Sequence, residues 1–254
     1  MTYLDQYQKK GYLIVNDVYS SSEVDQIKEI VNNLDLEKVE HSKDKSGYPF
    51  RITNITPKNN KLREIVEKEK AMAILEECIE DKVIFFKDKY ISKQKGGRVF
   101  VPHTDGAFVT YNYRLKKETK GWWTYASKFI HLQIMVVDNT EKNGCLHICK
   151  RESADPDYYI SKYFLNDRSK KSGEIDEKFH EDIKKRSVPV TGRKGAVLIF
   201  DPLCIHFSNQ NETEDLRDLF LITYNRASDG DNFEISDVDK QNAIKHHKDF
   251  IDDQ

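Results

Sequence analysis

The sequence predicts a mainly β protein, an antiparallel sandwich or barrel preceded by a largely helical segment. Amphipathic helical patterns dominate residues 1–80. From residue 82 onward, short runs of β-branched and aromatic residues alternate with turn signals, which is typical of such folds. No internal repeat is visible in the 254 residues, a length common for one β domain. We therefore expect a single domain over residues 1–254, with its β core at residues 82–226.

The N-terminal part, residues 1–80, is expected to be mainly helical and to contain one short strand. Residues 11–18 (GYLIVNDV) have the composition of a short strand. Residues 20–34 carry apolar residues at helical spacing behind a serine cap and an acidic residue, the pattern of a helix start. Residues 61–79 form a second amphipathic pattern, whereas the polar, turn-rich residues 35–60 predict a loop.

The β core is predicted from seven short runs. They are KVIFFKDKYISK (82–93), GRVFVPH (97–103), FIHLQIMVVD (129–138), GCLHIC (144–149), SVPV (187–190), GAVLIFD (195–201) and DLFLITYN (218–225). Two long segments, residues 106–128 and 150–187, break this rhythm. Loops of that length in a compact domain usually serve as lids or binding loops, so both are expected to be lid-like insertions.

The composition excludes several classes of protein. A formal net charge of −2, with acidic and basic residues interleaved, argues against a nucleic-acid binder. No apolar run is long enough for a membrane span, and no leader pattern opens the chain, so we expect a cytoplasmic protein. The four cysteines are too few and too dispersed for a disulfide framework. A small-molecule substrate is the expected partner, and the oligomeric state is not predicted.

Two distant segments together suggest a metal site. His103 and Asp105 lie two residues apart at the end of a predicted strand, so both side chains can address one point. His206 follows another predicted strand near the C-terminus. Two imidazoles and one carboxylate are the ligands of non-haem Fe(II) oxygenases, and they leave positions for a 2-oxo acid and dioxygen. Ser208 and Arg217, close to His206, have the chemistry to hold the distal carboxylate of 2-oxoglutarate.

With these residues, the sequence resembles the phytanoyl-CoA dioxygenase-like branch of Fe(II)/2-oxoglutarate oxygenases, which also includes ectoine hydroxylases. Four stretches carry the likeness in the family's order: residues 11–28, 93–105, 135–153 and 206–217. The last of these places an arginine eleven residues after the histidine, as in the family. The second stretch lacks the family's prolines, and the third ends in CKRES where the family has Gly-Ser-His.

The resemblance implies a double-stranded β-helix, the jelly roll of cupin-like proteins, with the N-terminal helices packed outside. It implies Fe(II), 2-oxoglutarate and O2 as cofactor and co-substrates. The residues that it assigns are His103, Asp105 and His206 as iron ligands, and Arg217, Ser208 and Lys93 around 2-oxoglutarate. Halogenating relatives replace the carboxylate ligand by a small residue, so the presence of Asp105 favours hydroxylation.

Strand parity suggests further site residues. His131 and Gln133 alternate with aliphatic residues, so they share one face. That face either looks at the metal, with Gln133 bonding the co-substrate or substrate, or faces solvent. Thr223 and Asn225 share the parity of Arg217 and become candidates for substrate contact if Arg217 points inward.

Aromatic residues in the first long segment are further candidates. Trp122, Trp123 and Tyr125 either wall the substrate pocket or pack against the outside of the barrel. For Lys93 the alternative to a co-substrate contact is a solvated surface lysine.

The predicted function is hydroxylation of an unactivated C–H bond in a small polar metabolite, such as a free amino acid or an amine. Three alternatives stay open. A non-catalytic cupin-like binding protein would keep the fold without turnover. A hydrolase or isomerase would use Zn(II) at the same three ligands. An oxygenase acting on an acyl thioester would need a broader basic and apolar cleft.

Overall fold

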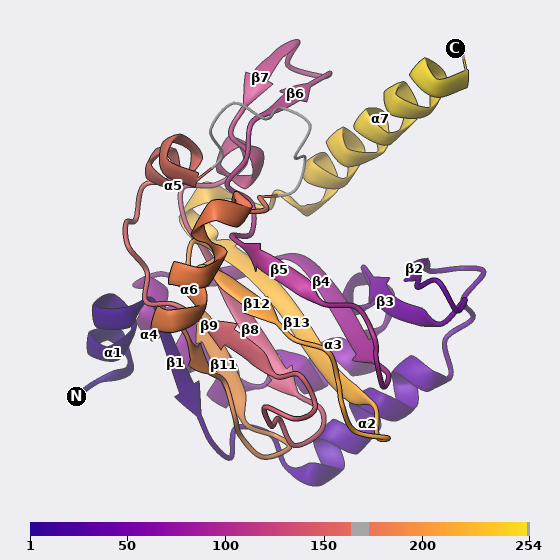
Figure 1. Cartoon of the computed structure of the whole chain (residues 1–254), viewed down its shortest axis with the longest axis vertical. Helices are drawn as coiled ribbons and strands as arrows, with labels where there is room; N and C mark the ends of the chain where they lie inside the picture. Colours follow the sequence, from indigo (N-terminus) through magenta and orange to yellow (C-terminus); the bar gives the residue numbers. More distant parts are fainter. Residues whose placement is uncertain (164–172, 253–254) are drawn as a thin grey trace.

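Two antiparallel sheets face each other in a jelly roll (Figure 1). The computed structural model describes residues 1–163 and 173–252, with side chains to residue 246. The seven-stranded sheet has the order β1 (Tyr12–Val15), β11 (Val197–Phe200), β8 (Phe129–Met135), β13 (Arg217–Arg226), β4 (Val83–Lys93), β3 (Pro49–Thr53), β2 (Glu40–Lys43). The four-stranded sheet has the order β10 (Val188–Pro189), β9 (Leu146–Ile148), β12 (His206–Ser208), β5 (Phe100–His103). The mainly β jelly roll that we expected is thus confirmed.

Helices cover the outer face of the large sheet. They are α1 (Tyr3–Lys10), α2 (Ser21–Asn32), α3 (Asn60–Val66) and α4 (Glu69–Ile79). A capping box fixes the start of α2, because the Ser20 side chain accepts from the Glu23 amide while the Glu23 carboxylate accepts from the Ser20 amide. Aliphatic side chains of the central strands, such as Leu132 and Ile222, are fully buried in the same cluster as the helices. This apolar layer leaves the other face of the sheet free to carry polar groups.

The prediction of a loop over residues 35–60 was wrong for part of the segment. Residues 40–43 and 49–53 form β2 and β3, which pair with each other, and β3 extends the sheet by pairing with β4. Its register places Arg51 opposite Ile91. Local sequence carries little signal for these strands, because their pairing with a distant edge decides the conformation.

The two long segments have structure of their own. Residues 106–128 hold the hairpin of β6 (Thr110–Asn112) and β7 (Lys117–Thr119), and the turn η2 (Gly121–Thr124). The hairpin extends from the same end of the jelly roll as α7 (Phe233–Asp252) (Figure 1). Asp239 on α7 joins them, since Asn112 and Arg114 donate to its carboxylate.

The second segment contains α5 (Pro156–Tyr163), η3 (Glu177–Phe179) and α6 (His180–Arg186); residues 164–172 of the predicted insertion lie outside the described residues. A lid role for either segment and the single-domain boundary stay predictions. Among the helices of the described part, none is long and apolar enough to cross a bilayer.

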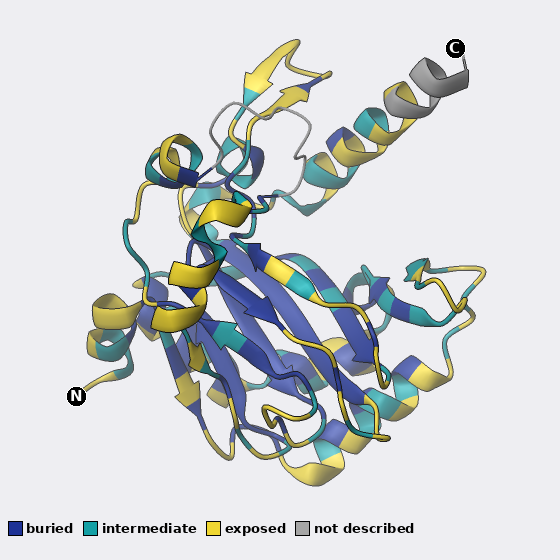
Figure 2. Ribbon diagram, viewed as in Figure 1, coloured by how far each residue is buried: buried dark blue, intermediate teal, exposed yellow. Residues whose placement is uncertain are grey.

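The central strands of the large sheet, β8, β11 and β13, are almost continuously buried (Figure 2). On its inner face, the registers place Lys93 opposite Arg217, Leu221 opposite Gln133, and Thr223 opposite His131. An aliphatic cluster that includes Ile91, Met135, Leu198 and Leu219 fills part of this interior. Charged and polar side chains therefore follow the inner face on both sides of the apolar cluster.

Candidate metal centre

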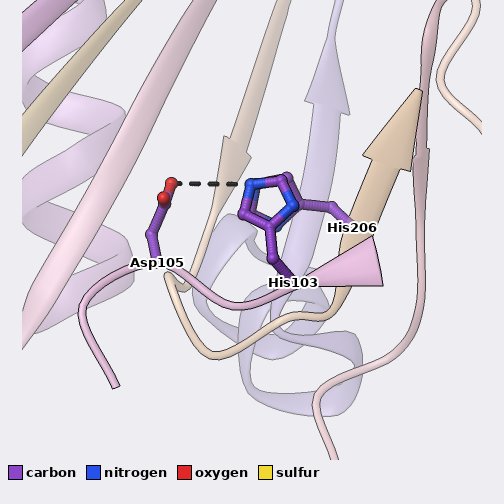
Figure 3. A group of neighbouring side chains, drawn as sticks. All are labelled: His103, Asp105 and His206. Carbon is purple, nitrogen blue, oxygen red and sulfur yellow. Dashed lines mark ion pairs between the residues drawn. The ribbon is translucent and has the colours of Figure 1, made fainter. Parts of the chain in front are cut away.

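His103, Asp105 and His206 converge at the mouth of the jelly roll (Figure 3). His103 ends β5 and His206 begins β12, and the two residues are direct partners across these antiparallel strands. Their ring centroids lie 4.1 Å apart. One potential ligand atom from each of the three residues lies within 4.8 Å of the other two. No other such group of three or more His, Cys, Asp or Glu residues occurs among the described residues.

Backbone carbonyls fix the orientation of both imidazoles. The Nδ1 atom of His103 lies 2.8 Å from the carbonyl of Val101, and that of His206 lies 2.9 Å from the carbonyl of Cys204. A carbonyl only accepts, so Nδ1 carries the hydrogen and Nε2 keeps its lone pair for a metal. Burial lowers the pKa of both histidines, which favours the neutral form that ligates.

The carboxylate of Asp105 is surrounded by positive and polar groups. Burial would raise its pKa, but the charge of Lys89 and contacts with His131 and His206 bring that pKa well below its ordinary value. The Oδ2 atom lies 3.4 Å from Lys89 Nζ, 3.0 Å from His131 Nε2 and 3.7 Å from His206 Nε2. The carboxylate is therefore ionised, as a metal ligand must be.

These donors suit a divalent transition metal with open positions. Two neutral imidazole nitrogens and one carboxylate oxygen form a facial set on an octahedral ion. The same set would accept Zn(II), so the donors alone leave the metal undecided. The polar groups beside the triad distinguish an Fe(II) site that also holds a 2-oxo acid from a zinc site.

Arg217 is buried behind the triad with part of its guanidinium lacking a partner. Its side chain is 2% exposed, and one terminal nitrogen donates to the carbonyl of Gly144 at 2.9 Å. Its Nε and Nη1 atoms are buried without a hydrogen-bond partner among the described residues. Burial lowers the pKa of Arg217 to about 10, so the group stays charged at neutral pH. A buried cation with two unused donors fits a carboxylate bound inside the barrel.

Lys93 and Ser208 lie beside this guanidinium. Lys93 donates to the Ser208 hydroxyl at 2.8 Å and to the carbonyl of Asn209 at 2.5 Å. Burial, and next the charge of Arg217, lower the pKa of Lys93 to about 6. Lys93 is 3% exposed, so the alternative of a solvated surface lysine was wrong.

His131 and Gln133 also point inward. They are 0% and 1% exposed, so the alternative of a solvent-facing pair was wrong. Both polar atoms of the Gln133 side chain lack a partner in the described part of the chain. His131 lies between two residues, with Nδ1 3.0 Å from Thr223 Oγ1 and Nε2 3.0 Å from Asp105. The second contact is close, although its hydrogen-bond geometry is poor.

The remaining candidates differ in position. Trp122 lies near the triad: its amide donates to the carbonyl of Gly106 at 3.0 Å, and its ring lies 5.7 Å from that of His131. Gly106 has a φ of +79°, and a Cβ atom there would meet the indole at 2.5 Å, so glycine is required beneath it. Trp122 is thus held directly beside Asp105, the residue before Gly106.

Three candidates are occupied mainly with packing or local structure. Trp123 packs against Phe129, and the Tyr125 hydroxyl donates to Asp239 at 3.0 Å. The Asn225 side-chain amide donates to the carbonyls of Arg226 and Gly230, which ties the end of β13 to the next turn. Substrate contact by these three residues stays a prediction.

Sequence reasoning missed Lys87 and Lys89. Lys89 forms an ion pair with Asp105, and Lys87 Nζ lies 4.4 Å from the centre of the Trp122 ring. A signal was present, because KVIFFKDKYISK places lysines two residues apart on one face of a predicted core strand. Such a pattern inside a barrel indicates a binding function.

Replacing His131 with phenylalanine is expected to weaken metal binding by about 10- to 100-fold, because a group that orients a ligand carboxylate would be lost. The measurement is an anaerobic Fe(II) titration. His147→Phe is the matched control, since His147 stacks on Phe207 with ring centroids 4.9 Å apart and does not contact Asp105 among the described residues. Equal affinities in the two variants would mean that His131 does not support the ligand.

The proteins to which this chain is similar in sequence are described as dioxygenases or hydroxylases. A family model described as phytanoyl-CoA dioxygenase (PhyH) matches residues 7–219. A methylphosphonate hydroxylase from Gimesia maris is 24% identical over 249 residues, 95% of this chain and 86% of that protein. A 2-aminoethylphosphonate dioxygenase from an uncultured bacterium is 24% identical over 183 residues, and the match covers 71% of this chain and 60% of that relative.

Solved structures show the same fold. The structure of EctD from S. alaskensis with 2-oxoglutarate and 5-hydroxyectoine has a TM-score of 0.66 at 19% identity, covering 89% of this chain and 76% of that one. The non-heme alpha-ketoglutarate-dependent epimerase SnoN from nogalamycin biosynthesis has a TM-score of 0.64 at 18% identity, with 89% and 82% covered. At these identities the likeness shows the fold alone.

Proposed function

This chain belongs to the phytanoyl-CoA dioxygenase family, and on that premise we propose that it uses Fe(II), 2-oxoglutarate and O2 to hydroxylate an unactivated C–H bond of a small polar metabolite. The observation that carries the proposal is a combination. Three residues that can ligate a metal, His103, Asp105 and His206, lie together at the mouth of the barrel. Behind them lies the buried Arg217, whose Nε and Nη1 atoms have no hydrogen-bond partner among the described residues. A metal-binding protein or a zinc hydrolase has no need of the second element.

The residues fit the groups that such an enzyme holds. His103, Asp105 and His206 would bind Fe(II) through two Nε2 atoms and one carboxylate oxygen. Arg217 would bind the distal carboxylate of 2-oxoglutarate through its free donors, with Ser208 and Lys93 adjacent. When bound, Fe(II) and 2-oxoglutarate supply an oxidant that attacks unactivated C–H bonds.

The protein's own contribution is orientation and exclusion of water. His131 and Lys89 hold the Asp105 carboxylate, while the two carbonyl contacts hold the imidazoles. Gln133 offers an unused donor and an unused acceptor to a bound co-substrate or substrate. Phe200 packs against both His131 and His206, at centroid distances of 4.5 and 5.2 Å, and keeps this side of the site apolar.

Three observations support hydroxylation of a small polar substrate. The ligand carboxylate of Asp105 is present, and its loss is the feature that marks halogenating relatives. The interior beside the triad carries charged and amide groups, which suit a polar metabolite better than a long acyl chain. The names of two relatives contain methylphosphonate and 2-aminoethylphosphonate, both small polar compounds.

The test is conversion of 2-oxoglutarate to succinate by purified protein reconstituted with Fe(II) under nitrogen. We expect slow succinate formation on admission of O2, faster formation with a substrate from a metabolite panel, and none when Zn(II) replaces Fe(II). Turnover of any panel compound without O2 would point instead to a hydrolase or isomerase. Binding of 2-oxoglutarate without succinate formation would point to a binding protein.

A further inference from the structure

The inner face of β4 carries three lysines, two in the middle of the strand and one at its C-terminal end. Lys87, Lys89, Ile91 and Lys93 share this face, which the registers with β13 place beside the triad and Arg217. Lys89 contacts Asp105, whereas Lys93 contacts Ser208 beside the proposed 2-oxoglutarate anchor. At about 3.4 Å per residue, Lys93 lies roughly 14 Å from Lys89 along the strand. Lys87 and Lys89 are therefore separate from the groups that would hold the co-substrate.

Lys87 has no carboxylate partner within ion-pair distance in the described part of the chain. Its ammonium group lies over two aromatic rings instead, 4.3 Å from the centre of Phe86 and 4.4 Å from that of Trp122. Burial first, and next the charge of Lys240, lower the pKa of Lys87 to about 7; Lys89 adds to this effect, whereas Asp105 and Asp237 oppose it. The ring contacts stabilise the cation only partly.

Arg51 completes a basic wall on the neighbouring strand. Its register partner across β3 and β4 is Ile91. Its charge interacts most with that of Glu40, and next with those of Arg98 and Asp105. One terminal nitrogen donates to the Ser42 hydroxyl at 2.9 Å, but its Nε atom is buried without a partner among the described residues. Like Lys87, Arg51 has no carboxylate within ion-pair distance there.

The wall holds more positive charge than the site can neutralise. Arg51, Lys87 and Lys89 gather around Asp105, a carboxylate that would be shared with the metal. Glu40, which also attracts Arg51, is itself paired with Lys240, and Asp237 is the last of the charges acting on Lys87. Buried or half-buried cations without a counter-ion are unfavourable, and a bound anion would offset this cost. The chain as a whole has a formal net charge of −2, so the local excess is a property of this site and not of the protein.

We propose that Arg51, Lys87 and Lys89 form the anion-binding wall of the substrate pocket, and that the substrate carries a compact anionic group such as a phosphonate, sulfonate or carboxylate. This inference rests on the proposed function. Trp122, held over Gly106 beside Asp105, supplies an apolar surface for the carbon that bears the reacting C–H bond. Two or three cations in one wall suit a compact anion that presents several acceptor oxygens.

The test is calorimetric binding of small probes to protein loaded with redox-inert Ni(II) and 2-oxoglutarate. The probes are methylphosphonate, methanesulfonate, acetate and neutral dimethyl methylphosphonate. At least one anion is expected to bind, and the neutral ester is not. Lys87→Met is expected to weaken anion binding by about 30-fold or more, because a desolvated charge partner is lost. Lys87→Arg keeps the charge and is expected to retain most of the affinity.

Controls separate this inference from the proposed function. Lys82→Met removes an exposed lysine paired with Glu76 just ahead of β4 and is expected to change nothing. Lys87→Met should leave the affinity for 2-oxoglutarate unchanged, whereas wild-type protein that fails to bind 2-oxoglutarate would contradict the proposed function instead. The anion wall is overturned if no anion binds, if the neutral ester binds as tightly as the anions, or if Lys87→Met binds them like wild type. Arg51→Met, which removes a wall cation that has no ion pair with a metal ligand, provides a second variant should Lys87→Met fail to fold.

Discussion

Replacing Asp105 with alanine is expected to lower Fe(II)-dependent succinate formation by about a thousandfold or more, because it removes the only anionic donor of the proposed metal site. The remaining imidazoles are neutral, and Lys89 would be left facing them without its ion-pair partner. The uncompensated lysine charge would repel a divalent cation and add to the loss of the ligand. Fe(II) affinity, measured under nitrogen, should fall together with turnover.

Asp157→Ala is the matched control for this experiment. Its carboxylate is about half exposed and pairs with Lys120 on the surface, away from the triad. The same change of side chain there should leave both iron binding and turnover as in wild type. An Asp105→Ala protein that binds iron and forms succinate like the Asp157→Ala protein would place the metal elsewhere.

Two of the three triad residues carry a local signature, and the third, His206, is found through the distant segment that also holds Ser208 and Arg217. His103 and Asp105 are two residues apart, and a strand end makes both side chains point the same way. What sequence could not supply was the reason that the carboxylate stays ionised and oriented. Lys89 and His131 come from two other strands, and their contacts with Asp105 exist only once β4, β8 and β13 are in register.

The same limit explains the errors in the fold and at Lys93. Residues 40–53 look like a polar loop because β2 and β3 lie at a sheet edge and gain their strand conformation from pairing with β4. Lys93 looks like a surface residue because most lysines are exposed. Its burial follows from its place opposite Arg217, on the inward face of β4.

Replacing Arg217 with methionine is expected to weaken 2-oxoglutarate binding by about 100-fold or more, because two charge-assisted hydrogen bonds to the distal carboxylate would be lost. The fold should tolerate the change. Methionine has similar length, and the guanidinium leaves two buried donors unused in the absence of a ligand, so its removal costs the empty protein little stability. Lysine at this position keeps the charge but not the two-pronged geometry and should rescue binding only in part.

A shorter 2-oxo acid distinguishes loss of the contact between Arg217 and the distal carboxylate from general damage to the site. Pyruvate has the metal-chelating end of 2-oxoglutarate but no distal carboxylate, so Arg217→Met should bind it as weakly as wild type does, without a further penalty. Arg226→Met is the control on the same strand, since Arg226 pairs with Asp81 outside the site and should not affect either acid. A variant that loses affinity for pyruvate and 2-oxoglutarate by the same factor would show that Arg217 supports the fold or the metal and not the co-substrate. Because the proposed function depends on this guanidinium to distinguish an oxygenase from other metal sites, that result would remove its main support even if the triad bound iron.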